Sequence, residues 1–160
     1  HKFNGPYYPP TPAEQLPEAV DRWIASDVTG LRRRLLIVQN ETDAIIGMVS
    51  RYWISEETNW TAIGIVIFDV GNWGKGFGYE ALGMWCDYLF TSNPDFVRLD
   101  MRTWSGNIGM IKLSEKLGFV REATFRKARI VDGDYYDGLG FGILREEWDA
   151  RYPNGFGESS

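Results

Sequence analysis

Hydrophobic positions in the first 70 residues follow first a helical period and then a strand period. Segment 11–26 places its hydrophobic residues on one helical face, with Pro12 at the first helical position. Apolar runs over 35–40, 45–55 and 60–70 predict three strands, which are separated by short polar turns. Links this short join antiparallel neighbours, so we predict a three-stranded meander.

The rest of the chain alternates between helical and extended patterns. Asn107 is placed to cap a helix that Gly118 closes, and Asp132-Gly133-Asp134 is a hairpin turn. The predicted elements are helix 78–91, strand 97–103, the helix between Asn107 and Gly118, strands 119–131 and 136–144, and helix 145–152. We predict one α/β (α+β) domain over residues 1–160, with a mixed, mostly antiparallel sheet, flanking helices and a loose tail at 153–160.

A glycine-dense turn links the third predicted strand to the following helix. It contains Gly71, Gly74, Gly76 and Gly78, which is more glycine than a simple connection requires. Without a Cβ, each glycine lets backbone N–H groups approach a ligand closely, and a helix N-terminus attracts anions. The spacing matches neither the dinucleotide fingerprint nor the Walker loop. We therefore predict a site for a phosphate-bearing cofactor, with a tight structural turn as the alternative.

Composition limits the kinds of partner, metal site and catalytic group that we expect. The net charge of −5 argues against general nucleic-acid binding and is compatible with a cationic partner. Cys86 and His1 are the only residues of their types, so cysteine clusters, histidine–metal sites and histidine-dependent triads are not expected. Cys86 lies in a helical repeat and is interpreted as a core residue. With no apolar run of membrane-spanning length and no signal peptide in the sequence, we expect a cytoplasmic protein that needs no metal and binds neither membrane nor nucleic acid.

Two motifs in fixed order carry a family resemblance. The first is Trp-Gly-Lys-Gly-Phe-Gly-Tyr-Glu-Ala-Leu at 73–82, and the second runs from Asn107 to Glu-Lys-Leu-Gly-Phe at 115–119. With the strand order, these residues resemble the GNAT acyl-CoA N-acetyltransferases. The Trp-Gly-Lys-Gly turn and the hairpin at 132–137 are similar to the branch of the ribosomal-protein alanine acetyltransferases. That family opens with one further strand, so we expect that an N-terminal piece precedes His1.

The resemblance implies acetyl-CoA as cosubstrate and assigns its contacts. Backbone amides of the glycine turn would hold the pyrophosphate, the end of the third strand would pair with the pantetheine arm, and Asn107 would hydrogen-bond that arm. The implied cofactor-binding residues are Phe68, Asp69, Val70, Trp73, Gly74, Lys75, Gly76, Phe77, Gly78 and Asn107. Many members have Arg or Gln where this chain has Trp73, which leaves no expected side-chain contact to the pyrophosphate there.

Two residues are candidates for proton transfer. Ser114 occupies the position at which many GNAT members carry a Tyr that protonates the departing thiolate; the alternative is an ordinary exposed helix serine. Asp69 is the candidate general base, and the alternative is that it caps the glycine turn. Acidic turn residues are candidates to line an acceptor site or simply to be solvated: Glu56, Glu57, Asp134 and Asp137.

The predicted function is N-acetyl transfer from acetyl-CoA to a primary amine. The acceptor would be a protein N-terminus or a small polyamine or aminoglycoside, and it would attack directly in a ternary complex because no covalent nucleophile is evident. The alternative is a non-catalytic acyl-CoA-binding or sensor domain of the same fold. Homodimerisation is left open.

Overall fold

The computed structural model describes residues 30–157, which form one mixed sheet with helices. The strands are β1 (Arg34–Gln39), β2 (Ala44–Ser55), β3 (Trp60–Ile67), β4 (Arg98–Trp104), β5 (Val120–Val131) and β6 (Asp134–Leu144). The helices are the short 3-10 turn η2 (Val70–Asn72), α2 (Phe77–Ser92), α3 (Ile108–Leu117) and α4 (Arg145–Arg151). The predicted helix over 11–26 lies outside the described residues.

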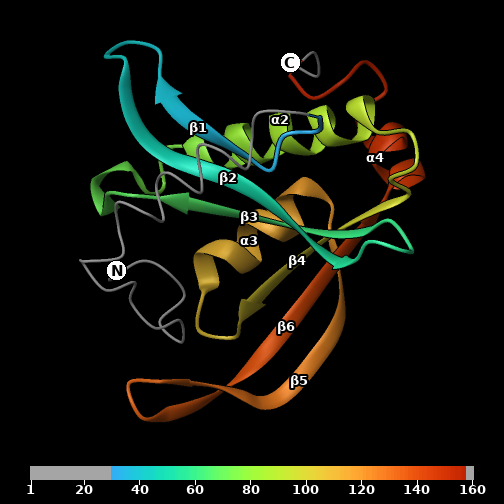
Figure 1. The fold of residues 1–160 in the computed structure, drawn as a ribbon. Helices are drawn as coiled ribbons and strands as arrows, with labels where there is room; N and C mark the ends of the chain where they lie inside the picture. Colours follow the sequence, from blue (N-terminus) through green and yellow to red (C-terminus); the bar gives the residue numbers. More distant parts are fainter. Residues whose placement is uncertain (1–29, 158–160) are drawn as a thin grey trace.

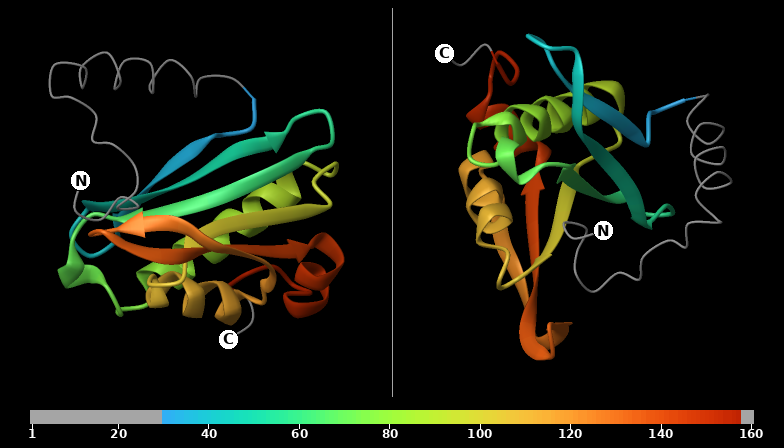
Figure 2. Two further views of the ribbon diagram at one scale, coloured as in Figure 1. Left: turned by 90° about the horizontal axis from the view of Figure 1, so that it is seen from below. Right: turned by 90° about the vertical axis from the view of Figure 1, so that its left-hand side faces the viewer.

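The sheet has the order β1-β2-β3-β4-β6-β5 (Figure 1). β1, β2 and β3 form the predicted antiparallel meander, and β4–β6 and β5–β6 are also antiparallel. Only β3 and β4 run parallel, as expected for two strands joined through a helix. The helices α2, α3 and α4 lie on one face of the sheet (Figure 2). The predicted fold class is therefore confirmed.

β3 and β4 pair over a short distance and then separate. Their register runs only from Thr61 opposite Leu99 to Ile63 opposite Met101. β3 continues to Ile67 and β4 to Trp104, and each stays paired with its other neighbour. Figure 1 shows the two strands diverging toward the side on which β3 leads to α2. We call this unpaired stretch, residues 64–67 and 102–104, the splay.

The core fills the space between the sheet and the helices. α2 contributes a buried face because its hydrophobic residues recur with helical spacing, and β4 and β6 contribute alternate positions. The largest fully buried side chains come from these elements and from the segments beside them: Trp85, Trp148, Phe96, Phe141, Ile63, Leu82, Leu89, Leu99, Met101, Leu117 and Ile143. Cys86 is among the buried residues, as predicted.

One boundary differs from the prediction. β3 ends at Ile67 instead of residue 70, because the Asp69 side chain accepts the Gly71 N–H and turns the chain into η2. Within the predicted tail, Phe156 packs its ring against Tyr79, Trp148 and Tyr152. Sequence pattern missed this contact because one aromatic residue among glycines carries no periodicity.

The two predicted turns with left-handed backbone are confirmed. Gly118 follows α3 at φ 99° and closes it, with its N–H bonded to the carbonyls of Glu115 and Ser114. Asp132 and Gly133 join β5 to β6 at φ 52° and 90°. Positive φ at both central positions matches the right-handed twist of a hairpin. None of the helices within residues 30–157 is long and apolar enough to cross a membrane.

Candidate functional site

The turn between β3 and α2 exposes a run of backbone N–H groups. Gly74 and Gly76 have φ of 73° and 94°, and a Cβ built on either would meet no atom within 4 Å. Gly76 is the N-cap of α2 and offers no side chain to cap it. Over residues 74–78, no backbone N–H has an acceptor in the part of the chain that the structure describes. We call this segment the amide cradle.

The amide cradle has the properties of an anion site. Its N–H groups lie at the beginning of a 16-residue helix, where the aligned peptide dipoles leave partial positive charge. Lys75 is exposed within it and adds a full positive charge. The open space around Gly74 and Gly76 leaves room for a phosphate to reach the amides. These residues therefore fit the pyrophosphate of a nucleotide cofactor such as CoA.

Gly78 packs the amide cradle against α3 and β3. A Cβ at Gly78 would lie 3.6 Å from Leu113 Cδ2 on α3 and 4.0 Å from Ile65 Cδ1 on β3. The start of α2 thus rests on one strand of the splay and on the helix that follows the other strand. This contact brings the predicted phosphate site and the splay together.

The Trp73 side chain turns back toward the strand that precedes it. Its indole N–H donates to the Ile67 carbonyl at 3.4 Å, and its backbone N–H donates to the Val70 carbonyl. The ring is about half exposed. Trp73 therefore shapes the approach to the amide cradle, and its indole N–H is directed to the protein.

Residues 68–70 follow β3 at the open end of the splay. The Phe68 N–H donates to the Ile46 carbonyl at 2.9 Å, so this group still belongs to the sheet. Asp69 is exposed and its Oδ1 accepts the Gly71 N–H at 2.8 Å, which is the capping geometry. The side chains of Phe68 and Val70 are each about half exposed. An extended ligand beside β3 would therefore meet apolar side chains and the backbone of Asp69 and Val70.

Asn107 begins α3 next to the end of β4. Its Oδ1 accepts the Met110 N–H at 3.1 Å, and its own N–H donates to the Trp104 carbonyl. The carbonyl half of the side chain is thus used as a cap, and the amide half keeps its donors. The residue is exposed, so both the predicted N-cap and a donor toward a ligand are compatible with its position.

Ser114 does not lie on an exposed face of α3. Its side chain is fully buried, and its hydroxyl donates to the Met110 carbonyl one turn earlier at 2.8 Å. Met101 Sδ lies 3.9 Å from the same oxygen. The expectation of an exposed helix serine is therefore wrong. A proton donor to a ligand would have to give up an internal hydrogen bond, which leaves a catalytic role for Ser114 as a prediction with little geometric support.

The acidic turn residues lie at opposite ends of the sheet. Glu56 and Glu57 precede β3, at the end where β3 and β4 are paired, so they cannot line the splay (Figure 1). Hydrogen bonds from backbone and from Ser55 lower the pKa of Glu57. Asp137 lies at the other end, where its N–H donates to Ser105 Oγ at 3.1 Å. Of the four acidic turn residues, Asp134 and Asp137 therefore lie at the same end of the sheet as the splay.

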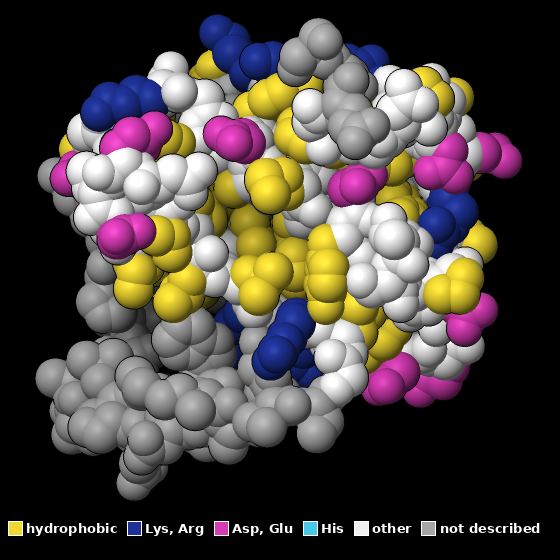
Figure 3. All heavy atoms as spheres, turned by 90° about the horizontal axis from the view of Figure 1, so that it is seen from above, with side chains coloured by type: hydrophobic (Ala, Val, Ile, Leu, Met, Phe, Trp, Pro, Cys, Tyr) yellow, Lys and Arg dark blue, Asp and Glu magenta, His cyan; other side chains and the backbone are white. Residues whose placement is uncertain are grey.

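Two hollows lie away from the splay. A groove of about 610 Å³ runs between β1 and α2, and hydrophobic side chains gather in it (Figure 3). Its walls include Leu35, Leu36, Val38 and Met84, all partly exposed. We did not predict this groove, although the unbroken apolar run at 35–38 was a signal for it. A strand with no polar alternation must be covered on two faces.

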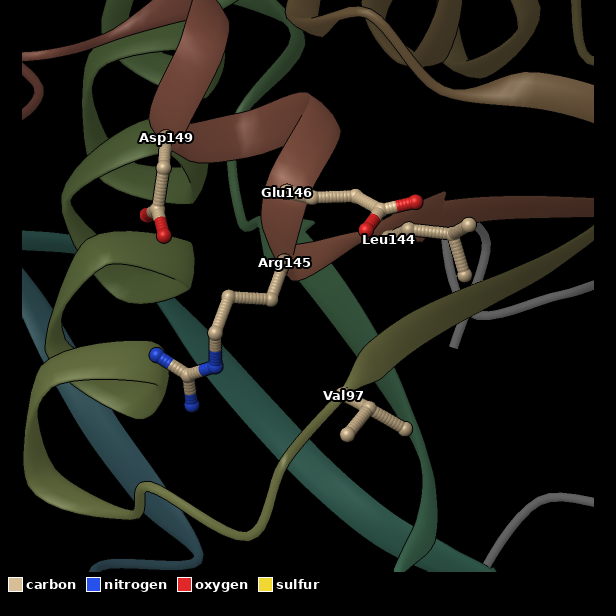
Figure 4. A pocket seen from close by; sticks show the side chains of 5 residues that line it. All are labelled: Val97, Leu144, Arg145, Glu146 and Asp149. Carbon is tan, nitrogen blue, oxygen red and sulfur yellow. The ribbon is translucent and has the colours of Figure 1, made fainter.

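The second hollow is structural. It lies beside Val97, Leu144, Arg145, Glu146 and Asp149 and measures about 290 Å³ (Figure 4). Arg145 extends toward the loop that leads to β4 and donates to three carbonyls there, those of Phe90, Asn93 and Phe96, at 2.7–2.9 Å. With three of its five N–H donors bound to backbone in this way, Arg145 holds the loop in place.

The remaining reactive groups are not grouped for catalysis. Burial raises the pKa of the Cys86 thiol well above its ordinary value, which suits a core residue. Within residues 30–157, no cluster of three His, Cys, Asp or Glu residues is arranged to hold a metal ion. The described site therefore consists of the amide cradle, the splay and the polar groups at its open end.

Known proteins match both the sequence and the fold. A family model described as an acetyltransferase (GNAT) domain matches residues 1–120. The prophage-derived uncharacterized N-acetyltransferase YokL of Bacillus subtilis is 28% identical over 130 residues, covering 81% of this chain and 72% of its own length.

Solved structures share the fold at lower identity. The spermidine/spermine N-acetyltransferase SpeG from Vibrio cholerae, solved with manganese ions, has a TM-score of 0.75 at 23% identity, covering 94% of this chain and 87% of that one. The ribosomal-protein-S5-alanine acetyltransferase from Vibrio fischeri has a TM-score of 0.68 at 20% identity, covering 90% and 81%. The family resemblance that the two motifs carry is thus confirmed, and this chain belongs to the GNAT family of acetyltransferases.

Proposed function

We propose that this chain transfers the acetyl group of acetyl-CoA to a primary amine, by direct attack within a ternary complex. The candidate acceptors are a protein N-terminus and a small polyamine or aminoglycoside amine. GNAT enzymes use acetyl-CoA, and a spermidine/spermine acetyltransferase is among the proteins of similar fold. The observation that carries the proposal is the run of unpaired N–H groups at residues 74–78, fixed beside the splay.

Different residues around the splay would bind different parts of acetyl-CoA. The amide cradle, with Lys75, would hold the pyrophosphate, as the helix N-terminus favours negative charge. The backbone of residues 68–70 would pair with the amides of the pantetheine arm, much as an added strand does. From the beginning of α3, just after β4, the side-chain amide of Asn107 would donate to this arm. When bound, acetyl-CoA supplies the acetyl group, which passes from sulfur to the amine nitrogen as the CoA thiol leaves.

Proton transfer is assigned to Asp69 before Ser114. One oxygen of the Asp69 carboxylate accepts the Gly71 N–H, and the other has no hydrogen bond among the described residues, so it can accept from an approaching ammonium. Ser114 is buried with its proton held by the Met110 carbonyl. The backbone N–H of Asp69 or Val70 would polarise the acetyl carbonyl, because fixed amide dipoles in a site stabilise developing negative charge.

A non-catalytic acyl-CoA sensor is the second candidate function. The observation in its favour is the buried hydroxyl of Ser114, whose proton is held by the Met110 carbonyl. Of the two candidates for proton transfer, this leaves the Asp69 carboxylate alone. Binding of acetyl-CoA is common to both candidates. At a hundredfold excess over its dissociation constant, acetyl-CoA should add about 2.7 kcal/mol to the free energy of unfolding in either case.

Release of CoA thiol across a panel of amines separates the two candidates. The panel contains spermidine, an aminoglycoside and short peptides with free N-termini, each incubated with acetyl-CoA and enzyme. Thiol release that depends on an amine supports the transferase. If acetyl-CoA stabilises the protein but no amine releases thiol, the sensor is the correct assignment. Absence of any stabilisation by acetyl-CoA would contradict both.

A further inference from the structure

Over residues 138–142, β6 has no side chains on the face of the sheet opposite the helices. Leu139, Phe141 and Ile143 are buried toward the core, so the alternating glycines at 138, 140 and 142 point to the other face. Side chains of β4 and β5 meet across this row. Arg98 Nη2 reaches Glu122 Oε2 at 2.6 Å, and a Cβ at Gly142 would lie 2.5 Å from the same nitrogen.

The same arrangement places Arg102 beside β5 at the splay. Arg102 lies on β4 just beyond its last pair with β3, and it is exposed. Its guanidinium carbon lies 5.8 Å from the centre of the Phe125 ring, which is a cation–π distance. Since Met101 and Thr103 are buried toward the helices, Arg102 projects on the opposite face.

A bulge in β5 adds two more cations at this place. Phe125 pairs with Gly138 and Arg129 with Tyr136, so residues 126–128 stand opposite Asp137 alone. Arg126 and Lys127 are exposed and, with Phe125, line a hollow of about 520 Å³. Lys127 has φ 55°, an unusual conformation for a residue other than glycine. Bulges of this kind re-aim side chains, often beside functional sites.

Asp137 ties the bulge to the end of β4. Its Oδ1 accepts the Lys127 N–H at 2.9 Å. Its backbone is bonded to Ser105 twice, from the Asp137 N–H to Ser105 Oγ at 3.1 Å and from the Ser105 N–H to the Asp137 carbonyl at 2.9 Å. The strained conformation at Lys127 is thus held by fixed partners, and Arg126 and Lys127 keep a defined position relative to the splay.

The open end of the splay therefore has two lips of opposite charge. On the β3 side stands the exposed carboxylate of Asp69. On the β4 side stands Arg102, and across β6 from it, next to Phe125, stand Arg126 and Lys127 of β5. The Asp137 carboxylate beside them accepts the Lys127 N–H, and Asp132 and Asp134 lie farther out at the hairpin tip. The amide cradle lies on the helical face, so an acceptor can reach the splay from the face that carries these cations.

We propose that the acceptor is an amine that also carries a carboxylate, recognised by Arg102, Arg126 and Lys127 while its ammonium faces Asp69. This inference rests on the proposed function and names the class of acceptor within it. A polyamine has no group for the cationic lip and would be repelled by it. Free amino acids and peptides with acidic residues after the N-terminus share the required chemistry.

The test compares acceptors that differ only in charge. The set is Ala-Glu-Glu amide, its isosteric counterpart Ala-Gln-Gln amide, free alanine and spermidine, each assayed for kcat/KM by thiol release. The same set is run on Arg126→Glu/Lys127→Glu, on each of its two single variants, and on Arg121→Glu, which makes the same charge change as either single variant on an exposed β5 position opposite Phe141, away from the bulge at 126–128. Thermal unfolding and circular dichroism confirm that each variant is folded.

We expect Ala-Glu-Glu amide to exceed Ala-Gln-Gln amide by about tenfold at low salt, as a few exposed ion pairs would give, and less at high salt. Arg126→Glu/Lys127→Glu should abolish or invert this ratio, and Arg121→Glu should keep it. If free alanine is the best acceptor, the natural acceptor is a free amino acid. If the acidic peptide is the best acceptor, the natural acceptor is the N-terminus of a peptide. Preference for spermidine over both, or an unchanged ratio in the double variant, would overturn the inference.

A second measurement keeps the inference separate from the proposed function. If no acceptor releases thiol, the transferase proposal fails, and fluorescence anisotropy of a C-terminally labelled Ala-Glu-Glu peptide is measured with CoA present. Tighter binding than the glutamine peptide, lost in Arg126→Glu/Lys127→Glu, supports the carboxylate-recognising lip. Equal binding of both peptides contradicts it.

Discussion

The Asp69 carboxylate accepts a hydrogen bond from the Gly71 backbone N–H at 2.8 Å. This bond ends β3, starts η2 and directs the chain into the amide cradle. It also fixes one carboxylate oxygen at the open end of the splay while the other oxygen remains available. Asp69 therefore has a structural task, and in the proposed mechanism its second oxygen takes the proton of the acceptor amine.

Replacing Asp69 separates these two tasks. Asp69→Asn keeps an oxygen that can accept the Gly71 N–H, so the free energy of unfolding should change by less than about 0.5 kcal/mol, whereas Asp69→Ala should cost about 1 kcal/mol. If Asp69 accepts the proton, Asp69→Asn lowers kcat by about 100-fold or more and leaves CoA affinity unchanged. Chemical denaturation, calorimetric titration with CoA and steady-state kinetics measure the three quantities. Wild-type turnover in Asp69→Asn would show that Asp69 caps the turn and does not accept the proton.

Ser114 is expected to be structural. Ser114→Ala removes a hydroxyl that donates to the Met110 carbonyl, and alanine is the better helix former, so stability should change by no more than about 1 kcal/mol. Because the hydroxyl is buried, turnover should stay within about twofold of wild type, a change worth about 0.4 kcal/mol. Kinetics at saturating acetyl-CoA test this. A tenfold loss of turnover with unchanged CoA affinity would instead show that the hydroxyl protonates the departing thiolate.

Arg145 should be the more sensitive of two arginines near the C-terminus. It donates to the carbonyls of Phe90, Asn93 and Phe96, so Arg145→Ala leaves three acceptors without their partner and should cost about 3 kcal/mol or more. Arg151 donates to one exposed carbonyl, that of Lys116, and at 3.3 Å to the Tyr152 hydroxyl, so Arg151→Ala should cost about 1 kcal/mol. Urea unfolding of both variants gives the comparison. Equal losses would mean that the Arg145 bonds do not hold the loop.

The raised pKa of Cys86 predicts a loss of stability at high pH. Burial favours the neutral thiol in the folded protein, so the thiol's contribution is complete below its ordinary value of 9.0 and is lost as the pH rises from there toward the folded value. The free energy of unfolding should therefore fall more steeply above pH 9 in wild type than in Cys86→Ala. Urea unfolding from pH 8 to 10.5 measures the difference. Parallel curves for the two proteins would contradict the assignment.

The same burial predicts that Cys86 is unreactive in the native state. A disulfide reagent should label the native protein negligibly over the course of an assay and label one thiol in denaturant, since the chain has a single cysteine. Rapid native labelling would show that the core around α2 opens. The absence of labelling would also mean that thiol-release assays report CoA alone.

Sequence pattern predicted the parts of the fold that depend on periodicity and turn chemistry. The meander, α2, α3 with its Asn107 and Gly118 ends, and the hairpin at Asp132-Gly133 follow from local signals of that kind. The amide cradle was also predictable, because Gly74 and Gly76 are where positive φ is needed.

The missed features depend on contacts between distant segments. Burial of Ser114 follows from how α3 is rotated against β4, which brings its hydroxyl to Met101. The β5 bulge follows from Asp137 accepting the Lys127 N–H ten residues away. The distance of Glu56 and Glu57 from the splay follows from strand direction, which a list of turn acids does not contain. Each needs the register of the sheet, and periodicity along one segment does not give it.

The most direct test of the amide cradle is calorimetric titration of CoA into Gly76→Asp and Gly76→Asn. Both side chains are similar in shape and belong to the residues that adopt left-handed backbone most readily, so the two variants should fold alike and differ in one negative charge. Pantetheine, which lacks the phosphates, is the ligand control, and Gly78→Ala, whose Cβ fits at 3.6 Å from Leu113, is the glycine control. We predict that Gly76→Asp binds CoA about 100-fold more weakly than Gly76→Asn, with no difference for pantetheine. Equal CoA affinity in the two variants would contradict a pyrophosphate site at residues 74–78.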